Sequence, residues 1–416
     1  MAESVTDVCK RAAGAAPRIA QLERATKDAA LVAMADALHD SAGMLSDANA
    51  KDLELATEQG TSRALLDRLT LTPARLGSMA EGLRAVAAQN DPVGEVVSSW
   101  RRPNGLLIEQ VRAPLGVIGV IFEARPNVTS DVAGLCLKSG NVCVLRGSSI
   151  ALNSNRAIVE VLRAALPSAG VDSDALQLVP GAGRDAALEL MRAKGYVDLL
   201  VPRGGAALIK SIEDNATVPF IIDGDGNCHI YVDASADETM ATEIVVNSKA
   251  QRPSVCNAME TLLVNETLVD AWLPGALDAL AAEGVEIRGD KRVVEAWPKA
   301  TPATDDDWAT EYLDLVLAVK VVDSFDEAVS HINAFGTANA EGIVTNDLTA
   351  ARRFAAEVDA GSVFVNASTR FSDGGEFGYG AEIGISTQKL HARGPMGLTA
   401  LTSTKYVVWG EGQIRS

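Results

Sequence analysis

Val117-Ile118-Gly119-Val120-Ile121 is a short, continuous apolar run, as expected of a strand that is buried on both faces of a sheet. Similar runs follow at intervals that leave room for a helix between each pair, at 142–145, 176–179 and 197–201. Strands joined by crossover helices pair in parallel, because each crossover returns the chain to the same end of the sheet. The sequence therefore predicts a doubly wound, parallel α/β sheet.

A second series of the same kind begins near residue 240. Its strand-like runs lie at about 259–264, 314–322, 342–345 and 362–365. A chain of 416 residues exceeds a typical single domain, so two α/β domains fit better than one. Residues 3–90 come before both series and have helical spacing, with stop and start signals at Gly60-Thr61-Ser62 and Leu71-Thr72-Pro73. We expect a helical opening layer followed by two α/β domains.

Residues 95–113 have the pattern of a β-hairpin. Two strand-like runs flank Asn104-Gly105, a pair typical of tight turns between antiparallel strands. The run 403–409 near the C-terminus is a further strand with no helix close to it in sequence, and we expect it to join the hairpin in an arm. The N–H and C=O groups on an unpaired strand edge can pair with another chain. The arm therefore predicts a homo-oligomer, whose stoichiometry the sequence leaves open.

The composition indicates a globular enzyme that handles small molecules. The formal net charge of −18 argues against nucleic-acid or anionic-membrane partners, because these are bound through basic surfaces. The N-terminus, MAESVTDVCK, lacks the features of a signal peptide and no apolar run is long enough to span a bilayer, so we expect a cytoplasmic protein. The five cysteines show neither a disulfide framework nor metal-ligand spacing, which fits a reducing compartment and predicts no metal.

Cys256 is the candidate nucleophile. It lies in the segment Ser248-Lys249-Ala250-Gln251-Arg252-Pro253-Ser254-Val255-Cys256-Asn257, after a helix-like run and before a strand-like one. A thiol on such a loop can reach a substrate, and Lys249 and Arg252 supply positive charge that favours the reactive thiolate. The alternative is that Cys256 is a small, buried and inert side chain.

Glycine-rich turns follow two neighbouring strands of the first series. Gly181 and Gly183 follow the strand at 176–179, and Gly204 with Gly205 follows the strand at 197–201. Such turns let backbone N–H groups approach a ligand at the start of a helix. A third strand end carries Arg146, Ser148 and Ser149, a cation and two hydroxyls suited to a ribose or its phosphate. Tight turns without a ligand explain each segment equally well, but their position at adjoining strand ends favours a cofactor crevice.

The run Asp223-Gly224-Asp225-Gly226-Asn227 places side-chain oxygens at alternating positions, as a calcium loop does. The glycine and the glutamate that an EF-hand loop needs are replaced by Cys228 and Ala234, and the flanking residues are strand-like. The run therefore predicts a turn and no metal site. A role for Asp223 or Asp225 as a carboxylate near Cys256 stays open, as do the roles of the histidines at 39, 331 and 391.

The order of these segments resembles the aldehyde dehydrogenase superfamily. The likeness is carried by 114–121, by 139–146, by Pro180-Gly181-Ala182-Gly183 and by the loop cysteine. Within the superfamily, Phe122-Glu123-Ala124-Arg125-Pro126-Asn127-Val128-Thr129, the Cys256 loop and 377–387 resemble the γ-glutamyl phosphate reductase family, and the likeness covers nearly the whole chain. It implies an aldehyde dehydrogenase-like fold with three parts. These are a nucleotide-binding domain (1–94 and 114–238), a catalytic domain with the nucleophilic cysteine (239–399) and an oligomerisation arm (95–113 and 400–416).

The resemblance also implies an activity. An NADP-dependent oxidoreductase of proline biosynthesis would reduce L-glutamyl 5-phosphate with NADPH, through a thioester on Cys256, to L-glutamate 5-semialdehyde and phosphate. Asn127 would donate a hydrogen bond to the oxyanion, together with the backbone N–H of Cys256. The residues along the cofactor would be Arg146, Ser148, Ser149, Gly181, Gly183, Gly204, Gly205 and Glu311. Candidates for binding the charged groups of the substrate are Arg125, Lys138, Arg252, Arg370 and Glu382.

One departure from the superfamily separates the possible activities. Hydrolytic aldehyde dehydrogenases carry a general-base glutamate in a Glu-Leu-Gly-Gly segment, and the corresponding stretch here reads Ile221-Ile222-Asp223-Gly224-Asp225-Gly226. A reductase that expels phosphate does not need to activate water, so the missing glutamate favours it unless Asp223 substitutes. The alternatives are a hydrolytic or coenzyme A-acylating aldehyde dehydrogenase, and a catalytically silent nucleotide-binding relative. Channelling from a glutamate 5-kinase partner and feedback control stay open.

Overall fold

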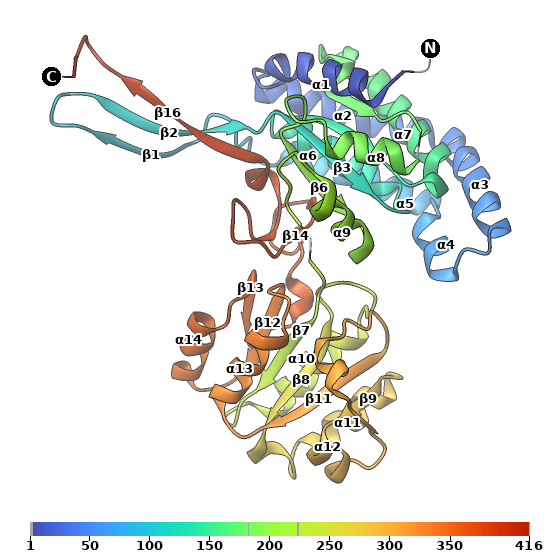
Figure 1. Cartoon of the computed structure of the whole chain (residues 1–416), viewed down its shortest axis with the longest axis vertical. Coiled ribbons are helices and arrows are strands. Elements are labelled where there is room, and N and C mark those ends of the chain that lie inside the picture. Colours follow the sequence, from blue (N-terminus) through green and yellow to red (C-terminus); the bar gives the residue numbers. More distant parts are fainter. Residues whose placement is uncertain (1–2, 182, 223, 416) are drawn as a thin grey trace. The chain divides into compact units, whose positions relative to one another are not determined.

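The computed structural model describes residues 3–181, 183–222 and 224–415, which form two compact units. Unit 1 holds the described residues up to Ile222, together with Gly378–Gly384 and the residues from Met396 on. Unit 2 holds the rest, from Gly224 to Phe377 and from Ile385 to Pro395. The colours of Figure 1 show that unit 1 combines blue, green and red parts of the chain, so it is built from both ends of the sequence.

Helices open unit 1, as the spacing of residues 3–90 predicts. They are α1 (Val5–Ile19), α2 (Arg24–Asp40), α3 (Ala42–Glu58), α4 (Arg63–Leu69) and α5 (Pro73–Ala88). The expected start signals are confirmed, because the side chain of Ser62 accepts a hydrogen bond from Leu65 N and that of Thr72 accepts one from Arg75 N.

The sheet of unit 1 is parallel, as predicted, with the strand order β5-β4-β3-β6. Its strands are β3 (Val117–Phe122), β4 (Val142–Arg146), β5 (Leu176–Leu178) and β6 (Leu199–Arg203). The helices that connect and follow them are α6 (Asn127–Lys138), α7 (Leu152–Ala165), α8 (Arg184–Met191) and α9 (Ala206–Asn215). All six residues of β3 are buried, in keeping with its place between β4 and β6. The chain runs from β3 out to β5 and returns to the other side of β3 at β6, so the order reverses between β3 and β6. In open α/β sheets ligands bind beyond the carboxyl ends of the strands at such a switch point.

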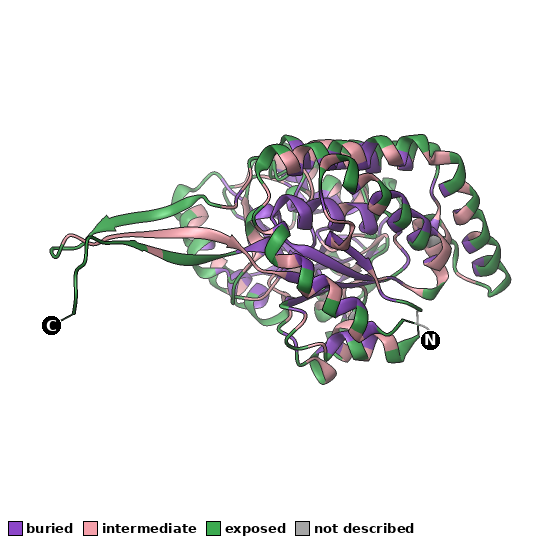
Figure 2. Ribbon diagram, turned by 90° about the horizontal axis from the view of Figure 1, so that it is seen from above, coloured by how far each residue is buried: buried purple, intermediate pink, exposed green. Residues whose placement is uncertain are grey.

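The arm is a three-stranded antiparallel sheet in unit 1 that reaches beyond the helices (Figure 1). The hairpin strands β1 (Val96–Arg101) and β2 (Leu107–Pro114) are joined by a turn in which Gly105 has a φ of 92°. The strand β16 (Thr402–Trp409) pairs with β2 along its whole length, which confirms that the tail joins the hairpin. Every residue of β1 is exposed, and Figure 2 shows the arm in green and pink beside the purple core strands.

Unit 2 is built on a seven-stranded parallel sheet, with the order β10-β9-β11-β8-β7-β12-β13. Its strands are β7 (Cys228–Val232), β8 (Met259–Asn265), β9 (Glu286–Gly289), β10 (Thr301–Pro302), β11 (Val316–Val322), β12 (Ala340–Val344) and β13 (Ser362–Val365). Its helices are α10 (Glu238–Ala250), α11 (Leu273–Ala282), α12 (Lys291–Ala296), α13 (Phe325–Phe335) and α14 (Leu348–Glu357). The four strands expected from the sequence are all present. The strands β9 and β10 were not expected, because they are too short to show a pattern in the sequence.

Two short strands and several 3₁₀ turns complete the structure. The strands β14 (Ile385–Ser386) and β15 (Gly394–Pro395) pair with each other. The 3₁₀ turns are η1 (Ser149–Ala151), η2 (Leu166–Ala169), η3 (Ser173–Ala175), η4 (Glu266–Leu268), η5 (Asp305–Ala309), η6 (Thr369–Phe371) and η7 (Leu398–Leu401). Among the residues that the structure describes, no helix has both the length and the apolar composition that crossing a bilayer requires.

The division into units differs from the expected domain boundaries at two places. The segment 224–238 was expected in the nucleotide-binding domain but belongs to unit 2, because β7 pairs with β8 and β12 in the middle of the unit 2 sheet. The segment Gly378–Gly384, which holds Glu382, was expected in the catalytic domain but belongs to unit 1. There the backbone N–H of Ile383 donates to the carbonyl of Met396.

Candidate active site

The Cys256 loop of unit 2 connects α10 to β8, as the sequence predicts. Helix α10 begins at Glu238, capped by the Asp237 side chain, and ends at Ala250, and the strand begins at Met259. Cys256 is partly exposed, whereas the next residues, Asn257 and Ala258, are buried. The loop therefore leaves the thiol at the surface and anchors the chain immediately after it.

A second segment of unit 2 packs against the backbone of Cys256. A methyl group built on Gly226 would lie 2.5 Å from the Cα of Cys256 and closer still to its carbonyl oxygen. That carbonyl accepts a hydrogen bond from the thiol of the buried Cys228, with a sulfur–oxygen distance of 3.2 Å. The N–H of Gly226 donates to Oε1 of Glu311 at 2.8 Å. Glycine is needed at 226 because the two backbones touch there, and this contact fixes the backbone of Cys256, the predicted nucleophile.

We expect Gly226→Ala to impair both catalysis and folding. The added methyl must push the Cys256 backbone away, and a displacement of about 1 Å in a reacting group costs roughly a hundredfold in kcat. The overpacking itself should lower the free energy of unfolding by about 1–3 kcal/mol. Steady-state kinetics and thermal unfolding measure the two effects separately. A matched control is Gly275→Ala on α11, where a methyl group meets no atom within 4 Å. Equal kcat values for the two variants would contradict the role assigned to Gly226.

The loop that contains η6 brings one arginine, Arg370, to the Cys256 loop. The hydroxyl of Thr369 donates to the carbonyl of Asn257 at 2.7 Å, and Asn257 Nδ2 donates to the carbonyl of Ser372 at 3.0 Å. This docking holds Arg370 near the thiol. Burial lowers the pKa of Arg370, the charge of Arg252 lowers it further, and Asp373 and Cys256 act in the opposite direction. Arg370 thus lies within electrostatic reach of two other predicted residues, Arg252 and Cys256.

Lys249 does not contribute to the positive surroundings of the thiol in the way expected. Its side chain is fully buried and its Nζ lies 2.5 Å from Oε2 of Glu260, which is also fully buried. Burial raises the pKa of Glu260 to about 7 and lowers the pKa of Lys249, and each partner opposes the shift of the other. A buried pair must compensate its charges internally. Lys249 thus ties α10 to β8, and Arg252 and Arg370 are the cations to consider at the thiol.

His331, whose role the sequence left open, is a core residue. It packs against the rings of His229, Trp308 and Phe335. Burial lowers the pKa of His331 to about 3, so the ring is neutral near pH 7. Its neighbour His229 contacts Glu341, with Nδ1 and Oε2 separated by 3.1 Å. No three His, Cys, Asp or Glu side chains form a candidate metal site within the described part of the chain.

The predicted cofactor residues of unit 1 lie at the carboxyl ends of its strands. At the switch point, the N–H of Glu123 after β3 donates to the carbonyl of Arg203 at the end of β6. Gly204 follows Arg203, and a methyl group on it would meet the Glu123 side chain at 2.7 Å. The missing side chain of Gly204 thus leaves room for close packing between these two strand ends.

The other strand ends of unit 1 are tied together as well. Arg146 ends β4, and its Nη2 donates to the carbonyl of Gly183 at 3.0 Å. Gly183 and Gly205 are the residues that precede α8 and α9, so backbone N–H groups of both helix starts point beyond the sheet edge. Gly181 has a φ of 82°, which requires glycine. Ser148 and Ser149 lie at the start of η1, and Ala182 is outside the described residues.

Asn127 is the first residue of α6, directly beyond β3. Its side chain is exposed, and its Nδ2 donates to Oδ2 of Asp131 one turn later, at 3.0 Å. Arg125, two residues earlier, is partly buried. Lys138, at the other end of α6, is not available to a substrate, because it is fully buried and paired with Asp28 and with the carbonyl of Ala87.

The predicted site residues are thus divided between the units. Cys256, Arg252, Arg370 and Glu311 belong to unit 2, and the other candidates, including Glu382, belong to unit 1. Asp225 is exposed, and Asp223, proposed as a possible substitute base, lies outside the described residues. Two contacts were not expected from the sequence: that of Gly226, for which only a turn was predicted, with Cys256, and that of Asp131 with Asn127. Glycine alternating with polar residues is only a weak indication of a close backbone contact such as that of Gly226. For Asp131 the available indication was its spacing, because a carboxylate four residues after Asn127 lies on the same face of a helix.

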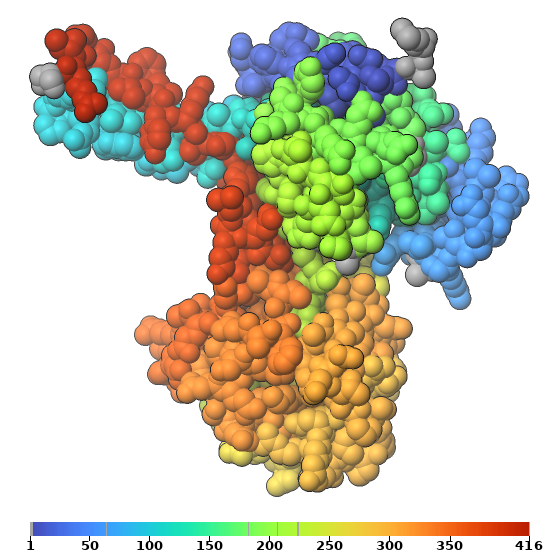
Figure 3. All heavy atoms as spheres, viewed as in Figure 1, coloured from blue at the N-terminus to red at the C-terminus, as the bar shows by residue number. Residues whose placement is uncertain are grey.

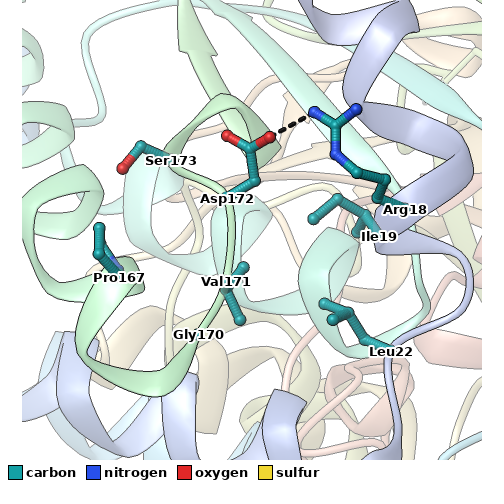
Figure 4. Close-up of a pocket in the computed structure, with 8 residues that line it drawn as sticks. All are labelled: Arg18, Ile19, Leu22, Pro167, Gly170, Val171, Asp172 and Ser173. Atoms are coloured by element: carbon teal, nitrogen blue, oxygen red, sulfur yellow. Dashed lines mark hydrogen bonds and ion pairs between the residues drawn. The ribbon is translucent and has the colours of Figure 1, made fainter.

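A surface pocket of about 560 Å³ lies elsewhere in unit 1, between the end of α1 and the segment around η2 and η3. Figure 4 shows its cation, Arg18, pointing at the carboxylate of Asp172, with which it forms an ion pair. None of its lining residues is a predicted site residue.

Known proteins are similar to this chain in both sequence and fold. The family model "Aldehyde dehydrogenase family" matches residues 1–292 and 302–407. A protein of Thermobifida fusca named gamma-glutamyl phosphate reductase is 57% identical over 411 residues, which cover 99% of this chain and 98% of the relative. A protein of Moorella thermoacetica with the same name is 56% identical over 98% of this chain and 97% of its own. The chain belongs to the γ-glutamyl phosphate reductase group of the aldehyde dehydrogenase family. The resemblance noted in the sequence is thereby confirmed.

Solved structures agree with this membership. The crystal structure of γ-glutamyl phosphate reductase from Thermotoga maritima matches over the full length of both chains, with 45% identity and a TM-score of 0.97. An acetylating aldehyde dehydrogenase from Geobacillus thermoglucosidasius matches with a TM-score of 0.70 at 17% identity, a likeness that shows the fold alone. Enzymes of the aldehyde dehydrogenase family use nicotinamide cofactors. The glycine turns at the helix starts of unit 1 fit such a group, because they offer N–H donors to a pyrophosphate.

Proposed function

We propose that this chain catalyses the NADPH-dependent reduction of L-glutamyl 5-phosphate to L-glutamate 5-semialdehyde and phosphate, the second step of proline biosynthesis from glutamate. The observation that carries the proposal is a partly exposed cysteine within electrostatic reach of Arg370, in a chain 57% identical over its length to a γ-glutamyl phosphate reductase. A thiol nucleophile and nearby cations are what an acyl phosphate requires, since one attacks the carbonyl carbon and the others bind the leaving phosphate.

In the proposed reaction the Cys256 thiolate attacks the γ-carbonyl carbon of the acyl phosphate. The negative charge that develops on the carbonyl oxygen is stabilised by two donors, the side-chain amide of Asn127 and the backbone N–H of Cys256. When the tetrahedral intermediate collapses, the bond to phosphate breaks and a thioester on Cys256 forms. Arg252 and Arg370 are the proposed phosphate ligands; the proposal is supported by the charges of Arg252 and Cys256, both of which act on Arg370.

A bound nicotinamide cofactor would supply the hydride that reduces the thioester, and Cys256 would then release the product as the aldehyde. We place the cofactor along Gly181, Gly183, Gly204 and Gly205, with Ser148 and Ser149 near its adenosine ribose. We propose that Arg146 selects NADPH over NADH. Its guanidinium contacts the carbonyl of Gly183, at the glycine turn before α8, and would bind the phosphate on the adenosine ribose. Glu311 is proposed near the nicotinamide ribose, and it already holds the Gly226 backbone in place.

The remaining charged groups of the substrate are its α-carboxylate and its ammonium. We propose Arg125 for the first and Glu382 for the second, on the grounds of charge and of their places in segments that resemble the family. Both are partly exposed and so are accessible to a small ligand.

The alternatives are a hydrolytic and a coenzyme A-acylating aldehyde dehydrogenase, and the acceptor that discharges the thioester separates them. Purified protein is given glutamate 5-semialdehyde and NADP⁺, and NADPH is followed by absorbance with phosphate, with coenzyme A, or with neither. The proposal expects turnover only with phosphate, and faster with NADP⁺ than with NAD⁺. Turnover without any added acceptor would mean that water is activated. Turnover with coenzyme A alone would indicate the acylating enzyme, and no turnover at all would favour the silent relative.

We also propose that the chain forms a homo-oligomer through the arm. Large apolar side chains are exposed there, namely Trp100, Tyr406, Val408 and Trp409. Figure 3 shows the tail strand in red lying along the cyan hairpin, and β1 and β16 are both edge strands because the order is β1-β2-β16. Exposed edges with apolar side chains favour pairing with another copy of the chain. Light scattering should give a mass that is a multiple of 43.5 kDa. A mass of one chain at micromolar concentration would contradict the proposal.

We also propose a cytoplasmic location, because free thiols, such as the five cysteines of this chain, are typical of reducing compartments. A glutamate 5-kinase in the same compartment would supply the labile acyl phosphate.

A further inference from the structure

Asn127 and Asp131 form a side-chain pair at the start of α6. Residues four apart lie on the same face of a helix, and here the Nδ2 of Asn127 donates to Oδ2 of Asp131 at 3.0 Å. The hydroxyl of Ser130 donates to the carbonyl of Asn127 at 2.9 Å, so the first turn of the helix is held in two ways. The second amide hydrogen of Asn127 makes no hydrogen bond within the described part of the chain. This N–H can therefore donate a hydrogen bond to an oxyanion.

The carboxylate determines which way the Asn127 amide faces. An amide has a donor end and an acceptor end of nearly the same size, so its two flipped orientations differ mainly in their hydrogen bonds. An ionised carboxylate only accepts, so only the Nδ2 end of Asn127 can face Asp131. If the amide flipped, Oδ1 would lie against the carboxylate and no hydrogen would be left to donate.

Asp131 lies on the side of α6 that faces α5, within electrostatic reach of the end of β6. Gly82 of α5 has no side chain at this contact, and a methyl group built on it would lie 3.9 Å from Oδ1 of Asp131. Arg203, at the end of β6, is the charged group that acts on Asp131 among the described residues. Burial raises the pKa of Asp131 to about 6, although the Asn127 hydrogen bond, the charge of Arg203 and Ser130 lower it.

We propose that Asp131 is a positioning residue that orients the amide of Asn127 so that its Nδ2 donates to the oxyanion of the reaction. The inference rests on the proposed function, because it gives Asn127 an oxyanion to stabilise. When Asp131 is ionised, the donor orientation is the only one that satisfies both side chains. When Asp131 is protonated, its O–H can donate to Oδ1 of Asn127, so the flipped amide becomes possible and places a lone pair where the donor was. The kcat should therefore fall as the pH is lowered through about 6.

The test compares Asp131→Ala, Asp131→Asn and Asn127→Ala with the double variant Asn127→Ala/Asp131→Ala. Asp131→Ala should lower kcat roughly tenfold to a hundredfold with little change in KM, as is typical when a partner of a reacting group is removed. Asp131→Asn can either accept from Asn127 or donate to it, as protonated Asp131 can, so at every pH its kcat should stay near the reduced value that the unsubstituted protein has below about pH 6, and the acidic limb should be lost. The double variant should be no slower than Asn127→Ala alone, because Asp131 acts only through Asn127. Asp36→Ala is the matched control, since Asp36 is an exposed carboxylate on α2 of the same unit, paired with Arg84.

Three results would overturn the inference. A raised KM with unchanged kcat in Asp131→Ala would mean that Asp131 binds the substrate directly. Losses that multiply in the double variant would mean that the two residues act independently. An acidic limb that persists in Asp131→Asn would assign that limb to another group. If the unsubstituted protein shows no phosphate-dependent turnover, the proposed function falls and this inference falls with it, so the two failures are told apart before any variant is measured.

Discussion

Cys256→Ala should abolish phosphate-dependent turnover, with a loss of kcat on the order of a millionfold. The variant removes the atom that forms the thioester, and no step of the proposed reaction can proceed without that bond. The fold should survive, because the side chain is partly exposed and the carbonyl that accepts from the Cys228 thiol is retained in alanine. The measurement is the initial rate of NADPH formation from glutamate 5-semialdehyde, with thermal unfolding as the check on structure.

The matched control for this variant is Cys9→Ala on α1 of unit 1. Cys9 is fully buried, and burial raises the pKa of its thiol to about 11, so it is an inert side chain. Cys9→Ala should leave kcat unchanged and lower the free energy of unfolding slightly, since a small cavity is left. Substantial activity in Cys256→Ala would contradict the covalent mechanism, whatever the control shows.

Asn127→Ala should lower kcat by roughly a hundredfold to a thousandfold, which is the usual cost of removing one oxyanion donor. Activity should persist, because the backbone N–H of Cys256 still donates. The KM should change little, since the interaction strengthens only as charge develops on the oxygen in the transition state. The side chain is exposed and lies at a helix start, so little stability is lost with it. The measurement is kcat and KM at a pH well above 6, where Asp131 is ionised.

A loss in Asn127→Ala as large as that in Cys256→Ala would count against this division of roles, because it would make Asn127 indispensable to bond formation. A loss confined to KM would move Asn127 to the substrate-binding groups. The conservative variant Asn127→Asp is a useful companion, since it keeps the size of the side chain and replaces a donor by a negative charge next to Asp131. It should be at least as impaired as the alanine variant.

The sequence predicted the parallel sheets because their strands are continuous apolar runs with helix-length gaps between them. Strands such as β3 and β8 are buried along their whole length, so all of their side chains lie in the interior. The strands that escaped prediction, β9 and β10, are short and carry exposed residues, and a two-residue strand has no periodicity to detect. The arm was predictable for a different reason, namely the Asn-Gly turn and the distance of the tail from any helix.

The boundary between the units could not be placed from local patterns. Residues 224–238 follow the first α/β series along the chain, and only their pairing in space, β7 with β8 and β12, assigns them to unit 2. The segment Gly378–Gly384 returns to unit 1 through contacts such as that of Ile383 with Met396. Contacts between residues far apart in sequence leave no trace in either segment alone.

Parts of the site were likewise hidden by contacts distant in sequence. Cys256 could be singled out because a helix, a proline and a strand surround it in sequence. Lys249 was misjudged, because a lysine seven residues before the nucleophile shows its charge in the sequence but not its buried partner Glu260. Gly226 was passed over because its importance lies in a contact with Cys256, thirty positions later, which only the folded chain reveals.

The most direct test of the covalent, phosphate-releasing mechanism is the intact mass of the protein during a single turnover. Protein mixed with glutamate 5-semialdehyde and excess NADP⁺ without phosphate should form one NADPH per active site and carry one glutamyl adduct, which peptide mapping places on Cys256. Adding phosphate should remove the adduct and restart turnover. Continued NADPH formation without phosphate and without an adduct would contradict the account, because water would then be the acceptor and Cys256 would not hold a stable thioester.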